Sequence, residues 1–475
     1  MLEFVFLIPF VTGLILLLLP GTVGRLILPF TAAIHLMVTV LGWQGKLPVF
    51  APSFFGAAPE GMLILMVTSF IFACSSIYSF TYAKETGFAN RPVFFGCMLL
   101  FLGTMSMVTI SDHPIVLWIA VEATTLVSAP LIFVHRSKEA LEATWKYVLI
   151  CSVGIALSLL GWFLSPLALD INNLQGTVTF SNLNSIASQL NPILLKVGFV
   201  FAIIGFGTKM GLAPMHTWLP DAHSQAPSPV SAMLSGALLN CAFLGIYKMH
   251  ILMTMAGLGD FSGNILIGFG LFSILVSAIF IMNQPDYKRM IAYSSIENMG
   301  IIAVGVGIGG VALYGAMLHL IHHSLLKSSL FLSAGNVMLG YGSKEVRRVG
   351  SMVSKMPASF VTFFAGFIGI SGLPPFGTFL SEMMILFGGF QEKRFLVVAL
   401  FLTSLSLVFA GAGKVFMAMS FGEESGVEAR KERLLRLLPP CVLLLASILF
   451  CFWMPESLST MINNSVKIIG GGFHG

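Results

Sequence analysis

The chain has 475 residues, of which 56% are hydrophobic and 9% are charged, with a formal net charge of +5. This composition is too apolar for a soluble globular protein, and it predicts one polytopic domain that folds in a lipid bilayer.

Apolar runs separated by polar, glycine-containing or proline-containing breaks predict an all-α fold with about 14 transmembrane helices, because about 20 apolar residues are needed to cross a bilayer. The first run lacks a basic leader and a small-residue cleavage site, so we expect it to stay as the first helix. The predicted spans are 2–19, 25–43, 61–82, 92–111, 114–134, 140–164, 193–215, 229–254, 263–283, 288–308, 311–339, 358–389, 395–420 and 436–455.

Lysine and arginine are concentrated in the connections that follow odd-numbered helices, such as the connections holding Arg136, Arg289 and Arg347. Basic loops are retained in the cytoplasm. We therefore expect a multi-pass protein of the inner (cytoplasmic) membrane with both termini on the external, periplasmic side.

Ionisable side chains inside the predicted spans are the first candidates for function, because a charge in hydrocarbon is costly and faces protein or water. A structural ion pair or a satisfied buried polar group is the alternative for each of them. In chain order they are Glu122, Lys146, Lys209, Glu297, His319, His322, His323, Lys327, Glu382 and Lys414.

The seventh span contains Lys209 directly before Gly211 and Pro214, which predict an interruption of the helix. The polar sequence HTWLPDAH follows, at a depth where apolar residues are expected. Interrupted backbone in a membrane lies against protein or a water-filled cavity. We therefore predict that Lys209 carries or gates protons.

A stripe of histidines lies in the eleventh span, HLIHHSLLKSSLF. His319, His323 and Lys327 recur at i, i+4 and i+8, and His322 lies beside this stripe. Imidazoles titrate near neutral pH, so the stripe predicts a proton relay. Metal binding by His319 and His323 is a rival, but the helix offers no cysteine or carboxylate as a further ligand, and we predict no metal site.

The break after Lys209 has an internal echo in the twelfth span, where SGLPPFG is followed by Glu382. Two interrupted helices, each with one buried ionisable group, are typical of transporters built from repeats, and chance similarity is the alternative. The predicted breaks are Gly211, Pro214, Pro374 and Pro375. The predicted parts are 1–91 (helices 1 to 3), 92–254 (first repeat, helices 4 to 8), 255–420 (second repeat, helices 9 to 13) and 421–475 (a charged loop, helix 14 and a tail).

The segments WIAVE, KMGLAPMHTWLPDAHSQAPSPVSAMLSG, PDYKRMIAYSSIENMG, HLIHHSLLKSSLF and GLPPFGTFLSE together resemble the antiporter-like proton-translocating subunits of respiratory complex I and of Mrp-type antiporters. The resemblance covers residues 60–420. The segments SSIENMG and LLNCAFLGIYK and the short length are most similar to the membrane component F of the hydrogenase-4 and formate hydrogenlyase group.

The resemblance implies two inverted five-helix repeats with broken helices 7 and 12. It implies an ion pair between Glu122 and Lys209 with Lys146 nearby, and a terminal ionisable group at Glu382. The histidines and Lys327 match the family's relay in helix 11. One departure is Asn240, which stands where relatives in complex I have a bridging lysine, whereas Lys248 comes two turns later.

The predicted function is proton translocation through these buried groups, driven by electron transfer in partner subunits of a hydrogenase-4-like complex. The chain has no cysteine ligands, dinucleotide-binding glycines or P-loop, so we expect no cofactor. The expected partners are other membrane subunits, including antiporter-like ones, the lipid bilayer and protons, with no nucleic acid.

Four alternatives remain open. Two are a chain M-like subunit of NADH-quinone oxidoreductase and a subunit of an Mrp-type monovalent cation/proton antiporter. The others are a stand-alone secondary carrier and a structural membrane scaffold. Sodium as the coupling ion would need oxygen-rich sites, and the buried lysines favour protons.

Overall fold

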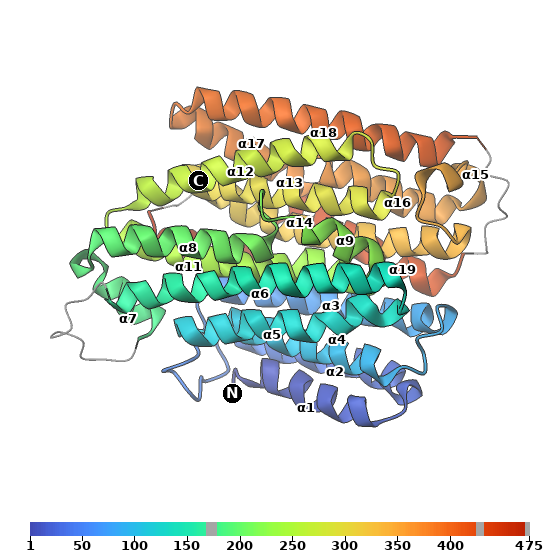
Figure 1. Ribbon diagram of the computed structural model, residues 1–475, viewed down its shortest axis with the longest axis horizontal. Helices are drawn as coiled ribbons and strands as arrows, with labels where there is room; N and C mark the ends of the chain where they lie inside the picture. The colour runs from blue at the N-terminus through green and yellow to red at the C-terminus, as the bar shows by residue number, and fades with distance from the viewer. Residues whose placement is uncertain (168–177, 424–431, 471–475) are drawn as a thin grey trace.

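A computed structural model describes residues 1–167, 178–423 and 432–470, and these residues are almost entirely helical (Figure 1). Extended pairing among them is limited to two isolated bridges, between Phe55 and Ser111 and between Asp286 and Glu345. The prediction of an all-α polytopic fold is confirmed. Most of the charged loop and the glycine-rich tail expected in 421–475 lie outside the described residues.

Every predicted span corresponds to a helix or to a set of consecutive helical segments. The spans that form one helix are α1 (Phe4–Leu18), α2 (Gly21–Trp43), α3 (Pro59–Glu85), α4 (Pro92–Thr109), α5 (Pro114–Ile132), α6 (Lys138–Leu167), α12 (Gly259–Ile281), α13 (Tyr287–Ile308), α14 (Gly310–Tyr341), α18 (Phe395–Phe421) and α19 (Leu434–Phe452).

Three predicted spans are divided. The seventh is α8 (Pro192–Met210), and the polar sequence after it forms α9 (Trp218–Gln225). The eighth consists of α10 (Ser228–Met233), a π-helical turn (Leu234–Leu238) and α11 (Leu239–Met255). The twelfth is α16 (Pro357–Ile370) followed by α17 (Gly377–Gln391).

Several short helices were not predicted. Their sequences are too short or too polar to stand out as spans, and tertiary packing stabilises such segments more than local propensity does. They are α7 (Phe180–Ser185), α15 (Met352–Lys355), α20 (Glu456–Lys467) and the 3₁₀ turns Phe133–His135, Ala187–Gln189 and Val346–Arg348.

Membrane crossing follows from helix length and composition. Within the described residues, 11 helices are long and apolar enough to span a bilayer, and Phe4–Leu18 and Pro357–Ile370 are shorter apolar helices. The chain is therefore a multi-pass membrane protein.

Local sequence explains where many helices begin. Proline occupies the first turn of α3, α4, α5, α8 and α16, where its missing N–H removes no intrahelical bond. Asn191 caps α8 by accepting from the backbone N–H of Ile193 at 2.9 Å. Asp286 caps α13 in the same way, accepting from Lys288 N at 2.8 Å.

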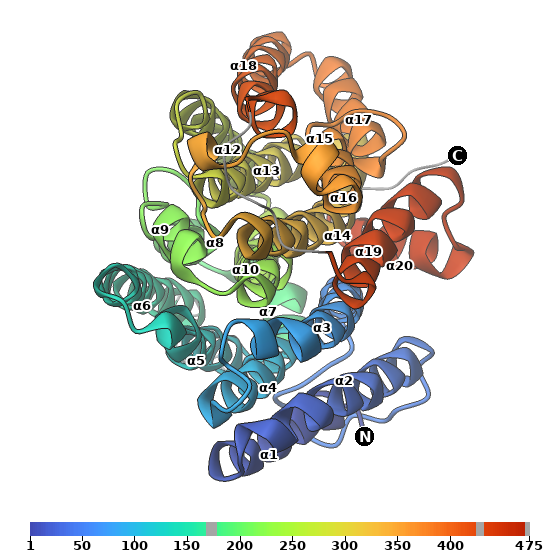
Figure 2. The same cartoon turned by 90° about the vertical axis from the view of Figure 1, so that its right-hand side faces the viewer.

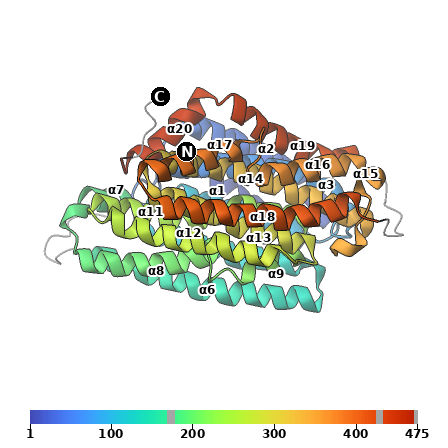
Figure 3. The same cartoon turned by 90° about the horizontal axis from the view of Figure 1, so that it is seen from above.

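The helices run side by side along the long axis of the molecule (Figure 1), and the end-on view places α14 near the middle of the bundle (Figure 2). The pair α1 and α2 lies at one edge and α18 at the opposite edge. Seen from above, α6 lies on one side and α19 and α20 on the other (Figure 3). The most deeply buried stretch is Ser228–Met255, whose apolar window is 100% buried, against 33% for α18. The ionisable groups of α11, α13 and α14 therefore lie in the interior of the bundle.

Candidate functional site

The first helix break lies between α8 and α9. Gly211 ends α8 in the left-handed conformation with φ +83°, which a glycine adopts without steric cost. The indole N–H of Trp218 then donates to the carbonyl of Thr208 at 2.8 Å and fixes α9 against the end of α8. Lys209 therefore lies on the last turn of a helix that ends inside the bundle.

The ammonium group of Lys209 is fully buried and is held by hydroxyl groups of two other helices. Its Nζ donates to Thr125 Oγ1 of α5 at 2.7 Å and to Tyr147 Oη of α6 at 2.6 Å. The Tyr147 hydroxyl also shares a hydrogen bond of 2.7 Å with Ser128. Hydroxyl groups can accept from an ammonium and donate to an amine, so this environment can satisfy Lys209 in either protonation state.

Glu122 lies on α5, one turn before Thr125, and it is half-buried. Its Oε1 accepts from Ser152 Oγ of α6 at 2.6 Å, while its Oε2 has no hydrogen-bond partner. The described residues contain no ion pair between Glu122 and Lys209. The structure thus brings Glu122 and Lys209 to neighbouring positions between α5, α6 and α8 without direct contact, and their coupling stays a prediction.

Lys146 has other partners than the implied pair. Its side chain is 45% exposed and forms ion pairs with Glu142 at 2.6 Å and with Asp221 of α9 at 3.2 Å. Asp221 also pairs with Arg289 of α13 at 3.1 Å. These charges line a cavity of about 320 Å³, so Lys146 belongs to a polar mouth and not to the surroundings of Lys209.

Asn240 lies in the centre of the molecule directly after the π-helical turn, a feature frequent at functional sites. Its Nδ2 donates to Ser324 Oγ of α14 at 2.7 Å and to the carbonyl of Gly236 at 3.0 Å. Ser324 is adjacent in sequence to His323. The amide therefore links the first half of the chain to the histidine helix.

Lys248 does not fold back toward Asn240. Its Nζ lies 3.0 Å from Oε1 of Glu60 on α3, and both side chains are only 4% exposed. Sequence reasoning missed Glu60 because an acidic residue after a proline at a helix start is an ordinary first-turn residue.

In the second half of the chain, Lys327 of α14 is fully buried against α13. Its Nζ donates to the carbonyl of Ile291 at 3.0 Å and also contacts Ser294 Oγ. Glu297 follows Ser294 by one helical turn and is 4% exposed. A buried lysine and a buried glutamate thus share one face of α13.

The histidines of α14 have different environments. His319 is held at both ring nitrogens, by Ser381 Oγ of α17 at 2.9 Å and by Asn298 Oδ1 of α13 at 3.0 Å. His322 pairs with Ser447 of α19 at 3.0 Å. His323 is fully buried and neither ring nitrogen has a hydrogen-bond partner. The described residues contain no group of three or more His, Cys, Asp or Glu that could hold a metal ion.

The second helix break lies between α16 and α17, where Gly372 has φ +67°. Glu382 of α17 is 9% exposed, and its carboxylate packs directly on this break: a Cβ placed on Gly372 would lie 2.1 Å from Glu382 Oε2. The break therefore creates the space that the Glu382 carboxylate occupies. Lys414, in contrast, lies exposed on α18.

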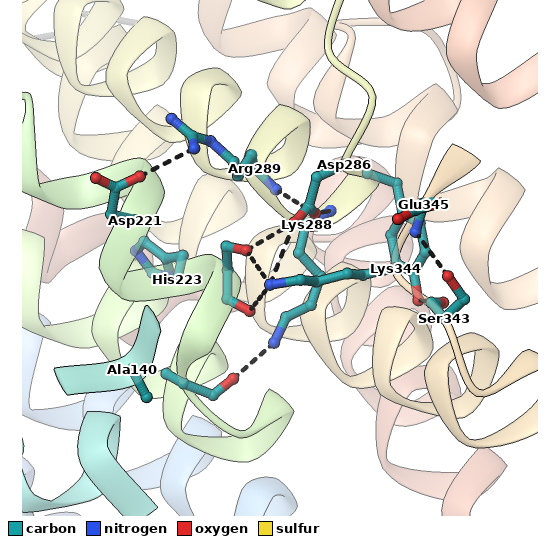
Figure 4. Close-up of polar contacts among 12 residues, drawn as sticks. Ala140, Asp221, His223, Asp286, Lys288, Arg289, Ser343, Lys344 and Glu345 are labelled. Carbon is teal, nitrogen blue, oxygen red and sulfur yellow. Dashed lines mark hydrogen bonds and ion pairs between the residues drawn. The ribbon is translucent and has the colours of Figure 1, made fainter. Parts of the chain in front are cut away.

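A further polar cluster joins α9, α13 and the connection after α14 (Figure 4). Lys344 Nζ lies 3.5 Å from Asp286 Oδ2 and donates to Ser224 Oγ at 2.7 Å. Lys288 is buried and donates to the carbonyl of Ala226 at 2.6 Å. His223 lies beside this cluster, stacked on Phe331 with ring centroids 4.8 Å apart. In the sequence these residues read only as basic loop charges and a helix cap.

His35 is a second group that sequence reasoning missed. It is 1% exposed and is held by Ser69 at 2.8 Å and Ser106 at 2.8 Å, which lie on α3 and α4. Both ring nitrogens are satisfied by hydroxyl groups, which is the environment of a structural histidine in a helix interface.

Comparison with known proteins agrees with this architecture. A profile of the family described as NADH:quinone oxidoreductase/Mrp antiporter, TM, matches residues 111–407. The hydrogenase-4 component F homolog of Methylacidiphilum infernorum (isolate V4) is 35% identical over 385 residues, which is 79% of this chain and 80% of that protein.

Two solved structures share the fold. A chain of the Mrp complex from Dietzia sp. DQ12-45-1b superimposes with a TM-score of 0.84 at 15% identity, over 99% of this chain and 97% of that chain. A chain of respiratory complex I from Thermus thermophilus has a TM-score of 0.83 at 21% identity, over 99% of this chain and 100% of that chain. The breaks, the buried ionisable groups and the profile lead to one conclusion: the chain belongs to the NADH:quinone oxidoreductase/Mrp antiporter family of transmembrane proteins.

Proposed function

We propose that this chain is the proton-translocating subunit of a hydrogenase-4-like or formate-hydrogenlyase-like membrane complex, driven by electron transfer in partner subunits. Lys209 carries the proposal: it is a fully buried lysine at a broken helix, held by neutral hydroxyl groups. A lysine in this environment can lose and regain a proton without leaving a charged partner unpaired.

The proposed path continues through Asn240 and the α14 histidines to Lys327, Glu297 and Glu382. Asn240 and Ser324 connect the two halves by a hydrogen bond of 2.7 Å. An amide cannot release a proton, so water carries the proton past Asn240 in this proposal. The assignment of 92–254 and 255–420 to two inverted repeats, with one interrupted helix in each, belongs to the same proposal.

The orientation follows from the basic connections. We place the cluster of Lys288, Lys344 and Asp286 on the cytoplasmic side and both termini on the periplasmic side. Hydrogenase-4 is the favoured complex because the component F homolog is 35% identical over four fifths of its length. The other membrane subunits of that complex, including antiporter-like ones, would then be the partners of this chain.

The test is proton uptake by sealed vesicles that contain the whole complex, measured together with the rate of electron transfer. Lys209→Ala and Glu122→Ala should each reduce the protons moved per electron at least roughly a hundredfold, the size of a lost acid–base group. If the two groups act as a pair, the double variant should lose no more than the worse single variant.

The control is Lys196→Ala. Lys196 lies at the start of α8 and stacks over the ring of Phe261 at 5.3 Å, outside the buried network. Each variant complex must first be shown to assemble. A normal proton-to-electron ratio in assembled Lys209→Ala would refute proton transport through Lys209, and a ratio that follows external sodium would favour a monovalent cation antiporter.

A further inference from the structure

A buried ion pair lies at the end of the bundle opposite α15. Lys248 of α11 and Glu60 of α3 approach to 3.0 Å with side chains 4% exposed. Glu60 Oε2 has no hydrogen-bond partner. A desolvated ion pair stabilises a fold little more than apolar side chains of the same size, so stability alone does not account for it. Buried ionisable groups in a membrane protein typically mark an ion path.

An aromatic lid covers this pair. Phe180, the first residue of α7, is 4% exposed, and its ring centroid lies 4.6 Å from Lys248 Nζ. Trp162 of α6 packs edge-on against the same ring at 4.9 Å. The cation–π contact ties the position of the lid to the charge of Lys248, because a neutral amine is attracted to the ring only weakly.

A carboxylate on the outer side holds the lid in place. Asp112, in the connection between α4 and α5, accepts from Phe180 N through its carbonyl at 2.8 Å and from Ser181 Oγ through Oδ2 at 3.0 Å. Desolvation raises the pKa of Asp112 above its ordinary value, and the nearby positive charge of Lys248 opposes this shift. Asp112 is half-buried, so it connects the lid with the surface at this end of the molecule.

We propose that Glu60, Lys248 and Phe180 form a proton gate, with Asp112 as its outer group. The inference rests on the proposed function, because it supplies the path with a gate in the first half of the chain. The proton passes from Lys248 Nζ to the Glu60 carboxylate, which leaves an amine and a carboxylic acid. Loss of the ammonium charge loosens the Phe180 ring. The Glu60 proton then passes to Asp112, and Lys248 takes a new proton from the interior.

The experiment uses the assembled complex in sealed vesicles with two measurements. One is the number of protons moved per electron, and the other is the passive decay of an imposed pH gradient without electron transfer. Glu60→Gln should lower the proton-to-electron ratio at least roughly tenfold. Phe180→Ala should leave electron transfer intact and speed the passive decay several-fold. Phe261→Ala is the matched control, because Phe261 also covers a lysine, Lys196, at 5.3 Å, and it should change neither measurement.

The outcomes separate this gate from the proposed function. Loss of transport in Lys209→Ala, together with normal ratios and tight vesicles in Glu60→Gln and Phe180→Ala, would overturn the gate and leave the pair a tether between α3 and α11. Normal transport in Lys209→Ala would overturn the proposed function instead. Where Glu60→Gln fails to assemble, the double variant Glu60→Gln with Lys248→Met removes both charges and decides by the same two measurements.

Discussion

The two helix breaks use the same backbone feature and place opposite charges beside it. Gly211 and Gly372 both lie in the left-handed conformation, with φ of +83° and +67°. Lys209 comes before its break, whereas Glu382 comes after its break. The difference shows that an interrupted helix provides space for an ionisable group, while the side of the break and the neighbouring groups decide which charge is accommodated.

The supports of the two groups also differ. Lys209 is held by side chains of other helices, Thr125 at 2.7 Å and Tyr147 at 2.6 Å. The carboxylate of Glu382 lies against the backbone of its own break at Gly372. We therefore expect the first site to respond to loss of a hydroxyl group, and the second to gain of a methyl group.

The largest effect should come from Glu382→Gln. Glutamine keeps the shape and hydrogen-bonding capacity but has no titratable proton, so protons moved per electron should fall about a hundredfold while electron transfer persists. Proton uptake by sealed vesicles, measured beside the redox rate, checks this. A normal ratio would make Glu382 a structural group of the broken helix.

Gly372→Ala should have the next largest effect. The new methyl group would lie 2.1 Å from Glu382 Oε2 and must displace the carboxylate. We expect transport to fall roughly thirtyfold, which corresponds to about 2 kcal/mol.

The control for this variant is Gly342→Ala. Gly342 has the same φ, +67°, and no atom lies within 4 Å of its Cβ position. Both variants therefore carry the backbone cost of a left-handed alanine, about 1–2 kcal/mol, and only Gly372→Ala moves the carboxylate. Equal transport in the two variants would show that the position of Glu382 is unimportant.

The number and order of the spanning helices could be predicted from the sequence, because each span needs about 20 apolar residues whatever its neighbours are. The breaks were equally clear, because glycine and proline change the backbone locally. Interruption at Gly211 is confirmed, and α9 was missed because its residues are polar although Trp218 and His223 are buried.

Partners of the buried groups were harder to predict than their positions. Lys146 pairs with Glu142 and Asp221, and Lys248 pairs with Glu60, which lies far away in the sequence. Periodicity places a residue on one face of its own helix but contains no information about which helix faces it. The α14 stripe illustrates the same limit, since three histidines close in sequence contact three different environments.

The histidines of α14 provide the third test. His323 has no hydrogen-bond partner, so His323→Ala removes a titratable ring without breaking a bond to another helix. Its transport should fall about tenfold, equivalent to about 1.4 kcal/mol. His322→Ala breaks the bond to Ser447 and removes the ring that packs against Gly377, so it should lower thermal stability more than transport.

Proton uptake and thermal unfolding of the purified complex distinguish these two variants. Unchanged transport in His323→Ala would remove this residue from the relay. Equal loss of transport in both variants, with equal loss of stability, would indicate that the stripe serves packing.

Tyr147→Phe should have the smallest effect and sharpens the comparison most. The substitution removes one of the two hydroxyl partners of Lys209 and keeps the aromatic ring, whose centroid lies 4.5 Å from Nζ. A net hydrogen bond contributes about 1 kcal/mol, so transport should fall roughly fivefold. Thr125→Val removes the other hydroxyl at nearly constant volume and should have a similar effect.

The double variant decides how the first site works. With both hydroxyl groups absent, Lys209 keeps the ring contact but has neither hydrogen-bond partner, and its interaction with Glu122 becomes the main way to hold a positive charge. Transport in Tyr147→Phe with Thr125→Val should then fall by more than the product of the two single effects, and adding Glu122→Gln should abolish it. Simple multiplication of the single effects would instead mean that the two hydroxyl groups act independently and that Lys209 does not depend on Glu122.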